Sequence, residues 1–99
     1  MLLQFLEKAV QMGGEAIEIE YKDGKQWIFV YRGNVGGGIA SLESGGADSK
    51  VLFRELADLK KKKRADLCGT THRLAFSQYE SFGEWVQRIE IKPARATAS

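Results

Sequence analysis

The sequence predicts an α+β protein in which a single antiparallel β-sheet of four to five strands packs against two helices on one face. Two observations predict this class. Two β-rich segments each surround a turn dipeptide, and an amphipathic helical segment precedes each of them. The expected order of elements is α-β-β-(β)-α-β-β, with the bracketed strand short. Helices that alternate with antiparallel hairpins are typical of one sheet with helices on one side.

The length and composition indicate an ordinary globular protein. The 99 residues correspond to one domain, expected over residues 1–92, with a disordered tail at residues 93–99. No apolar run approaches the roughly 18 residues of a membrane-spanning helix, so no membrane partner is expected. The only cysteine, Cys68, requires no oxidising compartment, and the first residues are charged too soon for a signal peptide. A cytoplasmic location is therefore expected.

The net charge of +2 is unevenly distributed along the chain. Residues 1–49 contain 4 basic and 7 acidic side chains, a net charge of −3, whereas residues 50–99 contain 11 basic and 6 acidic side chains, a net charge of +5. A chain of this kind could orient a charged partner or pair head to tail with a second copy. The small total charge does not indicate a nucleic-acid-binding protein.

The first elements expected are a helix and a hairpin. Apolar residues at helical spacing predict an amphipathic helix over residues 2–12, which Gly13-Gly14 stops. A hairpin follows over residues 15–32, where Asp23-Gly24 suits a two-residue type I′ turn and sets Lys22 opposite Lys25. One face of this hairpin is expected to meet the helices through its apolar residues, which are Ile17, Ile19, Tyr21, Ile28 and Val30.

The opposite face of this hairpin is the most informative candidate site. It carries Glu18, Glu20, Trp27, Phe29 and Tyr31. Three aromatic side chains on an outer face need a covering, because each buries about 150–250 Å² when packed. A central strand covered on both faces, a homodimer interface and a ligand site each explain them. A ligand beside Glu18 and Glu20 would be cationic or amphipathic.

The remaining elements are a third strand, a second helix and a second hairpin. Residues 32–38 are expected to form a glycine-rich loop and residues 39–42 a short strand. A helix is expected to start with Asp48 or Ser49 as its N-cap and to run to about Arg64. Residues 66–71 connect it to hairpin arms at 73–79 and 84–91. A turn at Phe82-Gly83 gathers one apolar face, which consists of Leu74, Phe76, Trp85, Ile89 and Ile91.

Two motifs raise the question of catalysis or cofactor binding. The glycine-rich segment lacks the lysine and the following helix of a phosphate-binding loop, so no nucleotide is expected there. Cys68 and His72, with Asp66 nearby, offer a thiol and an imidazole for a nucleophile–base pair, or two ligands for a metal. Structural zinc requires four ligands, and the chain has one cysteine and one histidine. No catalytic residue, metal ligand or cofactor is assigned.

The densest charge cluster consists of Lys60, Lys61, Lys62, Lys63 and Arg64. Cations complement the dipole at a helix C-terminus, so a solvated helix end explains the cluster. Contact with nucleic-acid phosphates also explains it, although Glu18 and Glu20 would repel a backbone stacked on the aromatic residues.

These features together predict a small non-enzymatic binding or assembly module. It would act through protein–protein contacts or self-association on the face that carries Trp27, Phe29 and Tyr31. The alternatives are nucleic-acid binding through residues 60–64 and a small enzyme or metal site at Cys68 and His72.

Overall fold

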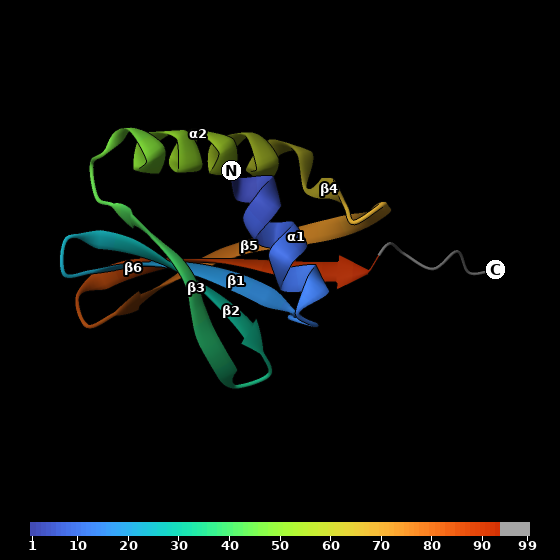
Figure 1. Cartoon of the computed structure of the whole chain (residues 1–99), viewed down its shortest axis with the longest axis horizontal. Coiled ribbons are helices and arrows are strands. Elements are labelled where there is room, and N and C mark those ends of the chain that lie inside the picture. Colours follow the sequence, from blue (N-terminus) through green and yellow to red (C-terminus); the bar gives the residue numbers. More distant parts are fainter. Residues whose placement is uncertain (94–99) are drawn as a thin grey trace.

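The computed structural model describes residues 1–93 and shows one curled sheet with both helices on the same side of it (Figure 1). Within these residues the sheet is antiparallel and its strand order is β3-β2-β1-β6-β5-β4. The elements in chain order are α1 (Leu2–Gln11), β1 (Ala16–Lys22), β2 (Lys25–Arg32), β3 (Val35–Glu43), α2 (Ala47–Lys62), β4 (Arg64–Leu67), β5 (Thr70–Ser81) and β6 (Glu84–Pro93).

The α+β class, the two helices and the single antiparallel sheet are confirmed, but the expected number of four to five strands is wrong. Part of the expected connection at residues 66–71 belongs instead to β4 and β5. Lys63 ends α2 in the left-handed conformation (φ 59°), and β4 begins at the next residue. Cys68 and Gly69 also have positive φ angles (53° and 82°), which is the geometry of a two-residue hairpin turn between β4 and β5.

The expected loop at residues 32–38 is reduced to a turn at Gly33 and Asn34, and the glycines that follow lie in a strand. Gly36 and Gly38 lie in β3 opposite Tyr31 and Phe29 of β2. A Cβ atom on Gly36 would lie 2.4 Å from Cε1 of Tyr31, so the ring occupies the place that a side chain would need. Gly36 therefore makes room for the Tyr31 ring of the neighbouring strand. The expected strand at residues 39–42 is the second half of β3, after a bulge.

Both predicted hairpin turns are confirmed. Asp23 and Gly24 have φ angles of 53° and 79°, and Phe82 and Gly83 have φ angles of 50° and 83°. The first turn sets Ile17 opposite Val30 and Ile19 opposite Ile28, and the second sets Leu74 opposite Ile91 and Phe76 opposite Ile89, as expected.

The core lies between the helices and one face of the sheet. Leu2, Leu6 and Ala9 of α1 are buried there, and α2 adds Leu52, Leu56 and Leu59. The sheet contributes mainly Ile17, Ile19, Ile28, Val30, Leu74 and Ile89.

The expected ends of the second helix need correction. Its N-cap is Gly46 rather than Asp48 or Ser49, and its last residue is Lys62 rather than Arg64. Ser49 is buried, and its hydroxyl donates a hydrogen bond to the carbonyl oxygen of Glu43, 2.6 Å away, which ties the helix start to β3.

The expected tail began at Pro93, which is instead the last residue of β6. Its other residues, 94–99, lie outside the part of the chain that the structure describes. Over residues 1–93, no helix has both the length and the apolar character needed to cross a membrane.

Candidate functional site

The candidate site is the open face of the sheet, meaning the face that the helices leave uncovered (Figure 1). Because side chains alternate along a strand, residues paired across the sheet share a face. The register puts Glu18 opposite Phe29, Glu20 opposite Trp27 and Ala16 opposite Tyr31. All five residues predicted for this face therefore lie together. The neighbouring strands β5 and β6 add Tyr79, Val86, Arg88, Glu90 and Lys92 to the same face.

Trp27, Phe29 and Tyr31 form an aromatic ladder along β2. The ring centroids of Trp27 and Phe29 lie 6.4 Å apart at an interplanar angle of 30°, and those of Phe29 and Tyr31 lie 6.4 Å apart at 51°. All three side chains are partly exposed. A pocket of 510 Å³ lies beside the ladder, and its lining comprises Lys22, Asp23, Lys25, Trp27, Phe29 and Gly38.

Glu18 is buried beside this ladder, with a relative exposure of 3%. Its Oε1 accepts a hydrogen bond of 2.6 Å from the Tyr79 hydroxyl, and its Oε2 accepts one of 2.7 Å from Nη1 of Arg88. Burying a carboxylate is expensive unless it is paired and hydrogen-bonded, and both conditions are met here. Glu18 therefore connects β1 to β5 and β6.

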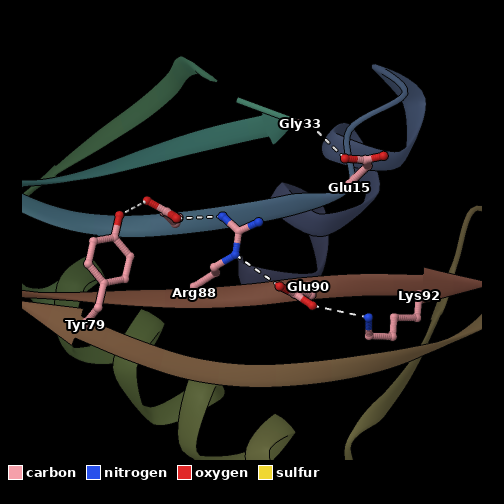
Figure 2. Close-up of polar contacts among 7 residues, drawn as sticks. Glu15, Gly33, Tyr79, Arg88, Glu90 and Lys92 are labelled. Carbon is pink, nitrogen blue, oxygen red and sulfur yellow. Dashed lines mark hydrogen bonds and ion pairs between the residues drawn. The ribbon is translucent and has the colours of Figure 1, made fainter. Parts of the chain in front are cut away.

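The polar network continues along β6 (Figure 2). Nε of Arg88 lies 3.3 Å from Oε2 of Glu90, and Nζ of Lys92 lies 3.2 Å from Oε1 of the same carboxylate. The hydrogen bond from Lys92, followed by that from Arg88, lowers the pKa of Glu90 below its ordinary value. The Arg88 guanidinium carbon also lies 5.8 Å from the centroid of the Tyr31 ring, within the range of a cation–π contact.

The two tyrosines of the open face have raised pKa values. The hydrogen bond to Glu18, with burial as the next cause, raises the pKa of Tyr79 to about 12. Burial, together with the negative charges of Glu18 and Glu20, raises the pKa of Tyr31 above its ordinary value. Both phenols therefore remain neutral hydrogen-bonding groups at neutral pH.

This arrangement changes the interpretation of charge at the site. Under the ligand-site alternative, Glu18 and Glu20 predict a cationic or amphipathic ligand beside the aromatic residues. The negative charge of Glu18 is instead balanced by Arg88 of the same chain. Arg88, Tyr79 and the buried Val86 were missed as members of this face. The predicted register of the second hairpin contained the necessary signal, because these residues alternate with those assigned to the core.

Cys68 and His72 have separate partners in the structure. The exposed Cys68 lies in the turn between β4 and β5, where its backbone N–H donates to Oε2 of Glu7 at 3.0 Å and its Sγ lies 3.7 Å from the Glu7 carbonyl oxygen. Nδ1 of His72 lies 2.9 Å from the carbonyl oxygen of Thr70. His72 is two residues from the core residue Leu74 on β5, so it lies on the helix-covered face. Among residues 1–93, no cluster of three or more His, Cys, Asp or Glu side chains could hold a metal ion.

The five cations from Lys60 to Arg64 belong to different elements. Lys60, Lys61 and Lys62 occupy the last turn of α2, Lys63 is its C-cap, and all of them are exposed. Arg64 opens β4 and lies directly opposite Arg73 of β5. Arg73 lies in turn opposite Lys92 of β6, which shares the open face with Arg88. The cluster therefore continues onto the open face as a row of three cations.

Comparison with known proteins gives no family for this chain. No protein-family model matches it, and no curated protein matches its sequence. The geometry of the open face is therefore the basis for a functional proposal.

Proposed function

We propose that the protein is a small non-enzymatic binding or assembly module that receives a partner protein, or a second copy of itself, on the open face of its sheet. The observation that carries this proposal is the aromatic ladder of Trp27, Phe29 and Tyr31. It lies partly exposed on the face without helices and borders a pocket of 510 Å³. Aromatic side chains are enriched in the cores of protein–protein interfaces.

The surroundings of the ladder support a protein partner. Typical interfaces have an apolar centre and a polar rim that excludes water from it. Lys22 and Lys25 lie at one end of the ladder, and Arg88 lies beside its other end. The charge of Glu18 is already balanced by Arg88 within the chain, so Glu20, opposite Trp27, is the carboxylate of this face that a partner would meet without an ion pair among residues 1–93.

The glycines of β3 support accessibility of the ladder from the sheet edge. Gly36 and Gly38 lie between the rings and the outer edge of the sheet, and β3 is an edge strand. Since glycine has no side chain, only backbone lies beside Tyr31 and Phe29 on this side, and the small side chain of Ser41 lies opposite Trp27. The edge of β3 also has unpaired backbone groups that an incoming strand could bond.

Replacement of Trp27 by Ser tests this function, with Trp85→Ser as a matched control. Trp85 lies on the other face of the sheet and is 59% exposed, so both variants remove one accessible tryptophan. Sedimentation velocity over a range of concentrations measures self-association, and affinity capture with each variant measures partner binding. We expect Trp27→Ser to lose the association, or the captured protein, that the wild type and Trp85→Ser retain.

Two results together would contradict the proposed function. The first is a wild-type chain that stays monomeric at high concentration. The second is an identical set of captured proteins for wild type, Trp27→Ser and Trp85→Ser. Circular dichroism and thermal unfolding of both variants exclude loss of the fold as the cause of lost binding.

A further inference from the structure

The β1–β2 and β5–β6 turns gather three carboxylates at one end of the molecule, where Lys22 and Lys25 also lie. The β1–β2 and β5–β6 turns lie at the same end of the long axis in Figure 1. A pocket of 390 Å³ lies between them, and three of its lining residues are Glu20, Asp23 and Glu84. Lys22 is the only cation in that lining. None of the three carboxylates forms an ion pair with any of residues 1–93.

The opposite end of the molecule is basic. It contains the row of Arg64, Arg73 and Lys92, in which each cation lies directly opposite the next across β4, β5 and β6. Like charges directly opposite one another destabilise a sheet. Lys92 has Glu90 as a partner, but Arg64 and Arg73 form no ion pair within the described residues. Figure 1 shows β4 and the end of β6 at the far end of the sheet from the hairpin turns.

We infer that the acidic end of one copy binds the cation row of a second copy, so that chains associate head to tail. Glu20, Asp23 and Glu84 supply three carboxylates, and the row supplies three cations. Arginine binds carboxylates through paired, charge-assisted hydrogen bonds, which suits Arg64 and Arg73. The contact joins two different surfaces of the same chain, so it is heterologous and can close into a ring or continue as a filament.

Complementarity within one chain favours a second copy over nucleic acid as the occupant of the cation row. Nucleic-acid phosphates would pair with Arg64 and Arg73 but would leave the acidic pocket without a role. The fully exposed ring of Phe82 at the rim of that pocket also offers an apolar and cation–π contact to an approaching arginine. This end-to-end contact goes beyond the proposed contact on the aromatic ladder, because it uses the two ends of the sheet.

Three double variants test the contact in the full chain. The basic-end variant combines Arg64→Gln and Arg73→Gln, and the acidic-end variant combines Glu20→Gln and Glu84→Gln. The control combines Lys50→Gln and Arg54→Gln on the exposed surface of α2, which changes the net charge as the basic-end variant does. All replaced residues but Glu20 are exposed, so the fold is retained, and circular dichroism verifies this.

Sedimentation velocity at low salt is the measurement. We expect wild type and control to grow in mass with concentration and to dissociate at about 0.5 M salt, where charges are screened within a few ångströms. Each end variant alone should associate at least about tenfold more weakly. An equimolar mixture of the two end variants should form a dimer and nothing larger, because each copy keeps one intact end. Trp27→Ser should retain this association, which separates it from the aromatic-ladder contact.

Several outcomes would overturn the head-to-tail contact. One is a wild-type chain that is monomeric at low salt and high concentration. Another is association that both end variants and their mixture retain unchanged. A third is a monomeric wild type that binds an oligothymidylate at low salt through Arg64 and Arg73, which would make the cation row a nucleic-acid site instead.

Discussion

The helix-covered face and the open face of the sheet both contain fully buried side chains, but they bury them differently. Ile17 and Ile89 of the covered face pack against leucines of α1 and α2. Glu18 and Val86 of the open face are equally inaccessible without a helix above them. Glu18 is enclosed through its bonds to Tyr79 and to the long side chain of Arg88.

This difference implies different responses to mutation. Apolar packing on the covered face is non-directional, so a slightly smaller residue loses part of the contact area and little else. The open face depends on hydrogen bonds to a buried charge. Removing one partner there leaves the charge without compensation, which is more damaging than the loss of the bond itself.

Arg88→Met should destabilise the protein most. It retains apolar bulk but removes the cation that balances the buried Glu18 carboxylate. Removing one member of a buried ion pair costs about 3–5 kcal/mol, and we expect about 2–3 kcal/mol here because the Arg88 side chain is 26% exposed. Ile89→Val, the next residue on the covered face, should cost only about 0.5–1.5 kcal/mol. Urea unfolding at neutral pH measures both.

The double variant Glu18→Gln with Arg88→Met is the control for this prediction. It removes the buried charge together with its partner, so it should recover more than half of the stability lost in Arg88→Met alone. If Arg88→Met is no worse than Ile89→Val, or if the double variant recovers nothing, the open face is not held by this ion pair.

Gly36→Ala should have the next largest effect. Its new Cβ atom would lie within 3 Å of three atoms of the Tyr31 ring, so the ring must move. We expect a loss of about 1–2 kcal/mol and a change in the near-ultraviolet circular dichroism of the tyrosines. Gly37→Ala is the matched control, because its Cβ would meet no atom within 4 Å, and it should stay within about 0.5 kcal/mol of wild type. Equal stabilities for the two variants would show that β3 does not depend on the ring position.

The covered face and the two hairpins were predictable from local sequence. A two-residue turn at Asp23-Gly24 fixes the pairing of β1 with β2, and the period of two then assigns every side chain to a face. The same reasoning placed the aromatic ladder correctly on the opposite face. Trp85 shows the limit of this reasoning, because it has the expected register on the covered face but is 59% exposed.

The rest of the site depends on contacts that local sequence does not specify. Glu18 meets Arg88 because β1 pairs with β6, and these two residues are 70 positions apart. A glycine-rich run is typical of a loop, and the Tyr31 ring that explains Gly36 lies on the neighbouring strand. Cys68 adopts a positive φ angle that cysteine rarely takes, so the turn into β5 carried no recognisable signal and β4 was missed.

The smallest effect expected is a pH dependence at the alkaline limit, which the open face should show through Tyr79. The hydrogen bond to Glu18 raises the pKa of Tyr79 from 10.0 to about 12 in the folded chain. A raised folded-state pKa adds stability that is fully present below the unfolded value, near pH 10, and that is lost as the pH rises toward 12. The physical cause is that a Tyr79 phenolate would face the Glu18 carboxylate without a proton between them.

Stability measured by urea unfolding should therefore fall between about pH 10 and pH 12 in wild type. It should fall less in Tyr79→Phe, which has no phenol at this position to ionise. Tyr21→Phe is the control, because Tyr21 lies on the other face and should leave the pH profile unchanged. Identical profiles for wild type and Tyr79→Phe would show that the bond to Glu18 contributes no pH-dependent stability to the open face.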